Sequence, residues 1–163
     1  MSYYYYGNDN NSGGGFLSNI PKVTRNLLII NVIIFIFTLV NRHLMTSTFA
    51  LFYPSSPYFH WWQVITHMFM HGGFWHILFN MYTLVIFGSV VERIIGGKKF
   101  LVFYFICGLG AVGLHLGTQH LQMLSYMEAA AEGSASAFAA INQIRLTPTV
   151  GASGAIYGVL IGY

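Results

Sequence analysis

Residues 27–40 have the sequence LLIINVIIFIFTLV, an uninterrupted apolar run that decides how the rest of the chain is interpreted. A helix needs ~20 apolar residues to cross a bilayer, and Val23 at one end and Leu44 at the other can extend the run toward that length. Lys22 and Arg25 stand just before it, as basic residues do at the cytoplasmic end of a membrane span. The run therefore predicts a transmembrane helix.

The composition of the whole chain points the same way. Only 7% of the residues are charged, 55% are hydrophobic, and the mean hydropathy is +0.59. A soluble domain usually carries about 25% charged residues, so this chain cannot cover a water-exposed surface. The net charge of +3 forms no basic stripe, which argues against a nucleic-acid surface. The single cysteine, Cys107, excludes an intrachain disulfide or a cysteine-based zinc site.

Three further apolar runs follow, and with the first they predict an all-α, polytopic transmembrane helix bundle. They cover about residues 65–95, 100–116 and 149–163. Residues 119–148 are polar and Ala-rich, which is compatible with an interfacial helix in a long loop. The last run is still apolar at Tyr163 and spans only ~22 Å of a ~30 Å hydrocarbon core. We therefore expect the chain to be truncated within its fourth membrane helix.

The two ends of the chain set the expected domain bounds. Residues 1–15 are rich in Tyr, Asn, Gly and Ser and lack the basic-then-apolar order of a signal peptide. We expect a disordered polar tail over residues 1–20 and one membrane domain over residues 21–163, incomplete at its C-terminus.

The basic residues predict the topology, because cytoplasmic loops of membrane proteins carry an excess of Lys and Arg. If successive runs alternate in direction, five basic residues fall on one side and two on the other: Lys22, Arg25, Arg93, Lys98 and Lys99 against Arg42 and Arg145. The N-terminus is then cytoplasmic. The starts of the second and fourth runs, near His71 and Ser153, share the outer side.

Polar side chains in membrane runs are costly and are candidates for function. The second run contains His67, His71, His76 and Asn80, and the fourth contains Ser153 followed by Tyr157. His76 and Asn80 are four residues apart and share one face of a helix. Ser153 lies between glycines in the first turn of its helix, where free amide groups can stabilise an oxyanion. This combination suits a serine nucleophile.

Simpler readings of the same residues remain open. A serine among glycines in a membrane helix is most often a packing contact. The spacing of His67 and His71, with Met70 between them, is compatible with a copper or zinc site, although no carboxylate lies nearby. Asn80 by itself would usually form a hydrogen bond between helices.

The joint pattern resembles the rhomboid family of intramembrane serine proteases. It consists of His71-x4-His76-x3-Asn80 on the second helix and Gly151-x-Ser153-Gly154 with Tyr157 on the fourth. The resemblance covers roughly residues 20–163 and implies a six-helix core, of which four helices are present. It also implies cleavage of transmembrane protein substrates by serine acylation, with no cofactor and no metal.

The resemblance assigns a role to each position. Ser153 would be the nucleophile, and His76 and Asn80 would form the oxyanion hole with the Ser153 amide. His71 would support the site, and Tyr157 would pack on the catalytic histidine. Acylation followed by hydrolysis needs water, so we expect a water-filled cavity between the second and fourth helices.

Two departures from the family pattern matter. The family's catalytic histidine lies on the sixth helix, so the chain as given should be inactive. The first loop also lacks the usual Trp-Arg pair, because Arg42 stands apart from Trp61 and Trp62. The alternative function is a non-catalytic rhomboid-like protein that binds transmembrane clients. The expected location is a cell membrane, a bacterial inner membrane being our choice.

Overall fold

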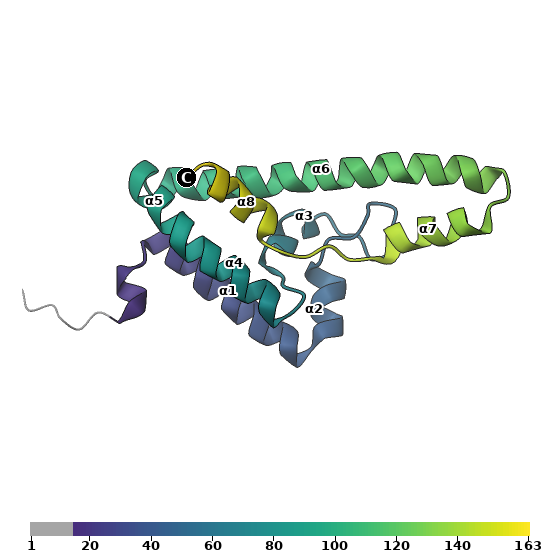
Figure 1. Ribbon diagram of the computed structural model, residues 1–163. Coiled ribbons are helices and arrows are strands. Elements are labelled where there is room, and N and C mark those ends of the chain that lie inside the picture. Colours follow the sequence, from purple (N-terminus) through teal and green to yellow (C-terminus); the bar gives the residue numbers. More distant parts are fainter. Residues whose placement is uncertain (1–14) are drawn as a thin grey trace, which may run out of the picture.

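The computed structural model describes residues 15–163, in which helices are joined by turns and loops and the one other regular feature is an isolated bridge (Figure 1). Three helical segments in it are long and apolar enough to cross a membrane, namely residues 22–40, 74–95 and 97–131. The expected all-α membrane bundle is therefore confirmed, and the protein is a multi-pass membrane protein. The tail expected over residues 1–20 lies mostly outside the described residues, and its end contains the short helix η1 (Phe16–Asn19).

The first span is α1 (Lys22–Val40), which includes the apolar run and the basic residues before it. The chain turns at Asn41, whose side-chain oxygen accepts a hydrogen bond from the amide of Leu44 at 3.1 Å. This cap starts the short helix α2 (Arg42–Phe49), so a polar residue fixes where the span ends.

The second span begins later than the sequence suggested. The residues from 65 onward first form two short helices, α3 (Gln63–Thr66) and η2 (His67–Phe69). The span itself consists of α4 (Phe74–Thr83), a π-helical turn η3 (Leu84–Gly88) and α5 (Ser89–Ile95). The expected start at residue 65 was wrong, because the Gly72–Gly73 turn interrupts the helix and Gly73 is fully extended.

The third span belongs to a helix that is much longer than the apolar run. Helix α6 (Gly97–Ala131) has 35 residues and is about 52 Å long, well beyond a ~30 Å hydrocarbon core. After a turn at Gly133, helix α7 (Ala135–Leu146) returns along it, so the two form a hairpin that projects from the bundle (Figure 1). The expected end near residue 116 was wrong, because the polar residues that follow are good helix formers.

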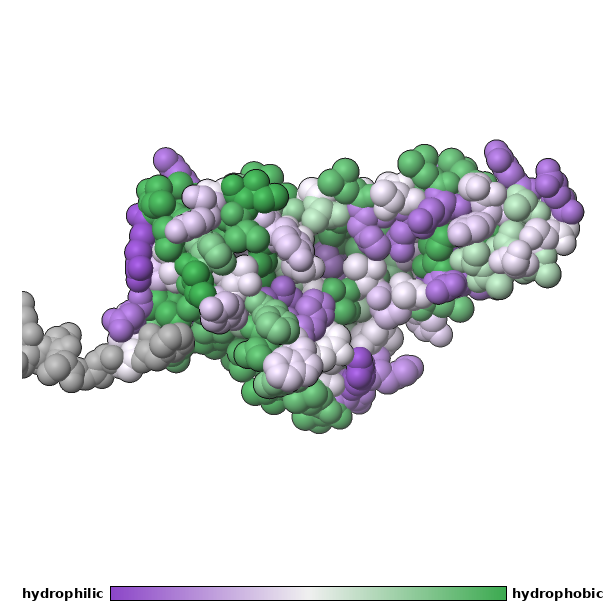
Figure 2. All heavy atoms as spheres, in the orientation of Figure 1, coloured by the Kyte–Doolittle hydropathy of each residue, from purple (hydrophilic) through white to green (hydrophobic). Residues whose placement is uncertain are grey.

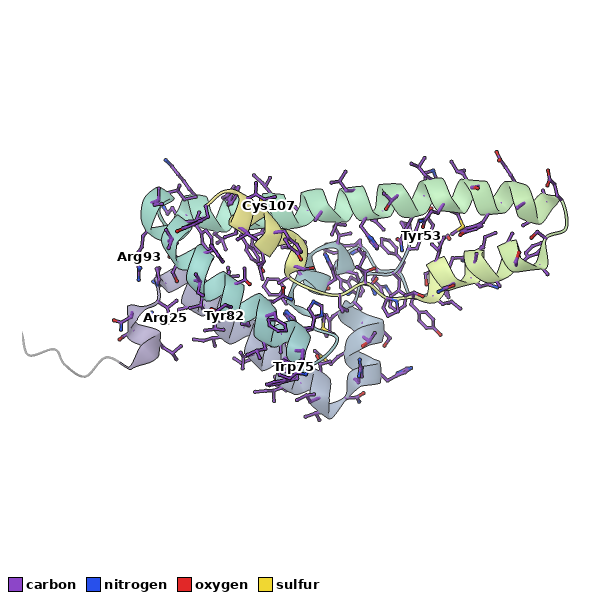
Figure 3. The ribbon with its side chains drawn as sticks, in the orientation of Figure 1. Arg25, Tyr53, Trp75, Tyr82, Arg93 and Cys107 are labelled. Atoms are coloured by element: carbon purple, nitrogen blue, oxygen red, sulfur yellow. The ribbon has the colours of Figure 1, made fainter. Side chains whose placement is uncertain are left out.

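Small residues let the last helix, α8 (Ser153–Ile161), lie directly against α6. A methyl group added at Gly154 would overlap Ala111, and one added at Gly158 would overlap Cys107. Figure 3 shows Cys107 at this crossing. The small residues of the third run therefore serve close helix packing, as in other membrane proteins.

A buried carboxylate joins the end of the second span to the start of the first. Glu92 accepts hydrogen bonds from the amides of Val23 and Thr24 at 2.9 and 2.7 Å and from the Thr24 hydroxyl at 2.8 Å. Negative charge is favourable at the N-terminus of a helix. The start of α1 and the end of α5 are thereby held at the same end of the bundle.

The surface agrees with a membrane environment. Figure 2 shows apolar side chains over the region of α1, α4 and α8, and polar ones at the α5–α6 turn and the tip of the α6–α7 hairpin. Large apolar side chains on α1 are exposed, including Phe37 at 60% and Val40 at 81%. Lipid is the solvent that such a surface requires.

Candidate active site

Ser153 is the first residue of α8, and the segment that leads to it is held in place by long-range bonds. Thr149 forms an antiparallel bridge with Leu51, with two backbone hydrogen bonds of 2.9 and 2.8 Å. The Thr149 hydroxyl also lies 2.9 Å from Nε2 of His115 on α6. The Gly151 amide donates to the carbonyl of His67 at 2.9 Å. The nucleophile candidate therefore follows a segment with little freedom.

Gly151 brings the histidine of the motif close to Ser153. Its φ of +132° lies in a region that favours glycine. A Cβ atom at this position would lie only 2.9 Å from Cε1 and Nε2 of His76, and 3.5 Å from Oγ of Ser153. Because both distances are measured from the same Cβ position, Nε2 of His76 and Oγ of Ser153 are at most 2.9 Å plus 3.5 Å apart. Glycine at 151 leaves the space that the imidazole edge occupies.

The other nitrogen of His76 has a backbone partner. The Gly72 amide donates a hydrogen bond to Nδ1 of His76 at 3.3 Å. A neutral imidazole has one protonated nitrogen, so with Nδ1 as acceptor the proton resides on Nε2. The ring of His71 packs edge-on against that of His76, with centroids 5.1 Å apart. This arrangement presents an N–H donor toward Gly151 and Ser153.

Asn80 lines the same cavity as His76 and Ser153. The cavity, between α4 and α8, has a volume of about 480 Å³. Asn80 is 8% exposed, and its Nδ2 finds no hydrogen-bond partner among residues 15–163. A buried donor without a partner costs about 1–3 kcal/mol. An incoming oxygen in this cavity would satisfy it.

A second cavity lies on the other side of Ser153. It has a volume of about 180 Å³ and is lined by polar side chains that include His67, His115 and Thr149. Polar walls and this volume suit ordered water. The cavity expected between the second and fourth helices corresponds to the larger one, between α4 and α8, and its water content stays a prediction.

Tyr157 follows Ser153 by one helical turn and lines the larger cavity. Its side chain is 64% exposed. The ring therefore offers a free aromatic face beside the nucleophile candidate. Trp75, at the start of α4 (Figure 3), lines the opposite wall of this cavity.

None of the histidines in the described part of the chain is hydrogen-bonded to Ser153. His115 bonds Thr149, and Nδ1 of His67 lies 2.9 Å from the carbonyl of Gln63. Burial lowers the pKa of His67, and burial together with the neighbouring His76 lowers the pKa of His71 to about 4. Both are therefore neutral near pH 7 but are weaker bases than a free imidazole, and neither is hydrogen-bonded to Ser153.

The alternative of a copper or zinc site finds no cluster of His, Cys, Asp or Glu ligands in the region that the structure describes. Over residues 15–163, no three side chains of His, Cys, Asp or Glu come close enough together to hold an ion. The pair His67 and His71 belongs to no such group there.

Comparisons with known proteins identify the family of the chain. The family model described as the rhomboid domain matches residues 58–163. The chain belongs to the rhomboid family. YdcA of Bacillus subtilis (strain 168), provisionally named a rhomboid protease, is 36% identical over 74 residues, which cover 45% of this chain and 36% of YdcA. The rhomboid protease GluP of the same organism is 30% identical over 100 residues, covering 61% of this chain and 15% of GluP.

The rhomboid match includes all the candidate site residues on α4 and α8. It does not include α1 or α2, which are nevertheless joined to the matched part by Glu92 and by Arg42. The chain spans well under two thirds of the length of either curated relative.

Sequence reasoning missed the contacts that hold the candidate site in place. His115 was noticeable as a polar residue near an apolar run, but only as a histidine that matches no base of the family, and its bond to Thr149 was not expected. The bridge between Leu51 and Thr149 could not be recognised in the sequence, because neither residue type is unusual among its neighbours.

Proposed function

We propose that the chain carries the nucleophile and the oxyanion-binding groups of an intramembrane serine endopeptidase that cleaves transmembrane protein substrates. The observation that carries this proposal is the shared cavity of Ser153, His76 and Asn80. Two of these residues offer N–H donors there, since Nδ1 of His76 already accepts from Gly72 and Nδ2 of Asn80 lacks a partner in the described chain.

In the proposed reaction, Oγ of Ser153 attacks a peptide carbonyl carbon of the substrate. The carbonyl oxygen becomes an oxyanion and accepts hydrogen bonds from Nε2 of His76, Nδ2 of Asn80 and the amide of Ser153. That amide belongs to the first turn of α8, where amide groups have no partner within the helix. The amine leaves with a proton, and water then hydrolyses the ester bond to Ser153.

The proton of Ser153 needs an acceptor, and we propose that it is a histidine outside residues 15–163. The exposed ring of Tyr157 is a suitable surface for an imidazole to pack on, one turn from the nucleophile. Residues 15–163 without that histidine should then turn over no substrate. His71 would act indirectly, by holding the ring of His76 through their edge-on contact.

We further propose that the N-terminus is cytoplasmic and that the site opens toward the outer side. The contact of Glu92 with the start of α1 supports this, because it gathers Lys22, Arg25 and Arg93 at one end of the bundle. An excess of basic residues marks the cytoplasmic side. A cell membrane is the location that this topology suits.

The test uses the full-length protein in proteoliposomes with a transmembrane reporter substrate and a fluorophosphonate probe. Wild-type protein should cleave the reporter and be labelled by the probe, and Ser153→Ala should lose both. Ser125→Ala removes an exposed hydroxyl from the part of α6 that forms the hairpin with α7, and should change neither cleavage nor labelling. If the wild type binds the reporter without cleavage and resists the probe, the non-catalytic alternative takes its place.

A further inference from the structure

Arg42 makes a contact that its position in the sequence does not suggest. It is the first residue of α2, beyond the end of the first span, and its side chain is exposed. Nη2 nevertheless donates a hydrogen bond of 2.8 Å to the carbonyl oxygen of Gly72, thirty residues further along. The guanidinium therefore reaches the turn that precedes α4.

The turn that Arg42 contacts has few other restraints. A Cβ atom at Gly73 would meet nothing within 4 Å, and one at Gly72 would make only ordinary contacts, the nearest at 3.7 Å. A 290 Å³ cavity lined by Arg42, His71 and both glycines lies beside it, so water can reach the turn. Two adjacent glycines in open surroundings have a large choice of backbone conformations. Bonds to neighbouring groups must select one of them.

The orientation of Gly72 matters because its amide is the partner of Nδ1 of His76. If the turn rotated, Nδ1 would lose this donor and could itself carry the proton. Nε2 would then be an acceptor and could not donate to an oxyanion. The nearby ring of His71 does not fix the proton instead, since its nitrogens bond no group within residues 15–163.

We infer that Arg42 is a positioning residue for His76. Its bond to the Gly72 carbonyl holds the turn in the orientation that directs the Gly72 amide to Nδ1, and this keeps the proton on Nε2. The effect of Arg42 on the proton position of His76 does not depend on the proposed function. Its consequence for rate rests on the proposed function of His76 as an oxyanion donor.

The direct test is the protonation state of His76 in the full-length protein, by NMR with ¹⁵N-labelled imidazoles, the His76 signals being assigned from their loss in His76→Gln. Wild-type protein should show a protonated Nε2 and an unprotonated Nδ1. In Arg42→Gln the two ¹⁵N shifts should move toward each other, as the two tautomers mix. Arg145→Gln removes the same charge and two hydrogen bonds to another carbonyl, that of Ser55, and should leave the His76 shifts unchanged.

Two results would overturn the inference: a protonated Nδ1 in the wild type, or wild-type His76 shifts in Arg42→Gln. The lost bond is on the surface, so we expect Arg42→Gln to fold. If it does not fold, Arg42→Lys replaces it in the test. The lysine side chain differs in length and shape from arginine, so it should bond the Gly72 carbonyl less well and give a tautomer mixture between those of the wild type and Arg42→Gln. Wild-type shifts in folded Arg42→Lys would then also count against the inference.

Kinetics separate this inference from the proposed function. In Arg42→Gln, kcat for the reporter should fall about tenfold with KM unchanged, less than the ~10²–10³-fold loss expected when a donor is removed. Arg42→Lys should recover part of the rate. If the shifts move and kcat does not, the role of His76 fails while the positioning by Arg42 holds. If kcat falls and the shifts do not move, the positioning fails.

Discussion

Replacing Gly151 by alanine is the most direct test of how His76 and Ser153 are brought together. The new methyl carbon would lie 2.9 Å from both Cε1 and Nε2 of His76, a separation that real Cβ atoms essentially never show. The ring or the segment before Ser153 would have to move by about 0.6 Å or more to reach van der Waals contact at 3.5–4.0 Å. The Gly151 φ of +132° adds backbone strain of about 1–3 kcal/mol.

The movement should affect rate more than folding. A displacement of about 1 Å in a catalytic group can cost 10²-fold, so we expect kcat to fall between tenfold and a hundredfold. The strain should lower the free energy of unfolding by about 1–3 kcal/mol. Rate would be measured with the reporter substrate in proteoliposomes, and stability by thermal unfolding in detergent.

The control is Gly110→Ala on α6. This glycine is exposed, and a Cβ atom there would meet nothing within 4 Å. Alanine should be neutral or should stabilise the helix by up to about 1 kcal/mol. Wild-type kcat in a folded Gly151→Ala protein would refute the reasoning, because the imidazole edge would then not need the space that glycine leaves.

Three further predictions concern other parts of the structure. Asn80→Ala should lower kcat by ~10²–10³-fold without lowering stability, since Nδ2 bonds nothing in residues 15–163; single-turnover acylation measures the first and thermal unfolding the second. Glu92→Gln should lower the free energy of unfolding by about 1.5–3 kcal/mol, because three hydrogen bonds to a charged carboxylate are weakened; an unchanged melting temperature would contradict this. Stability should fall as the pH drops from 6.5 to 4, because His71 binds its proton in the unfolded chain before it does in the fold; His71→Gln should reduce this dependence without abolishing it, because the pKa of His67 is lowered too.

The helical architecture could be predicted from the sequence because it depends on local patterns. Residues 27–40 are apolar without interruption, and they lie in a helix. Ser153 was expected in the first turn of its helix, and α8 begins at that residue. His76 and Asn80 are four residues apart on α4 and line one cavity. Each of these outcomes follows from spacing and residue type within about one turn of helix.

The parts that could not be predicted depend on contacts between distant residues. The bridge of Leu51 with Thr149 joins the first loop to the segment before the nucleophile candidate. The bond of Arg42 to Gly72 joins residues that are thirty positions apart. The late start of α4 and the length of α6 have a different cause. Two adjacent glycines stop one helix and good helix formers continue the other, and both are local features that hydropathy alone does not reveal.

Unpaired polar groups alone would not have located the site. Within residues 15–163, buried side-chain atoms without a partner also occur in Asn31, Ser89 and Tyr104, on helices that pack in the core. None of these three lines the cavity that contains Ser153, whereas Asn80 does. A donor that lacks a partner and faces open space can be satisfied by a ligand, whereas one enclosed by packed side chains cannot. The combination of an unpaired donor, a cavity and a serine at a helix start is therefore what distinguishes catalysis from packing. Asn31→Leu, which replaces a buried amide that does not line the cavity, should consequently leave kcat unchanged where Asn80→Ala lowers it.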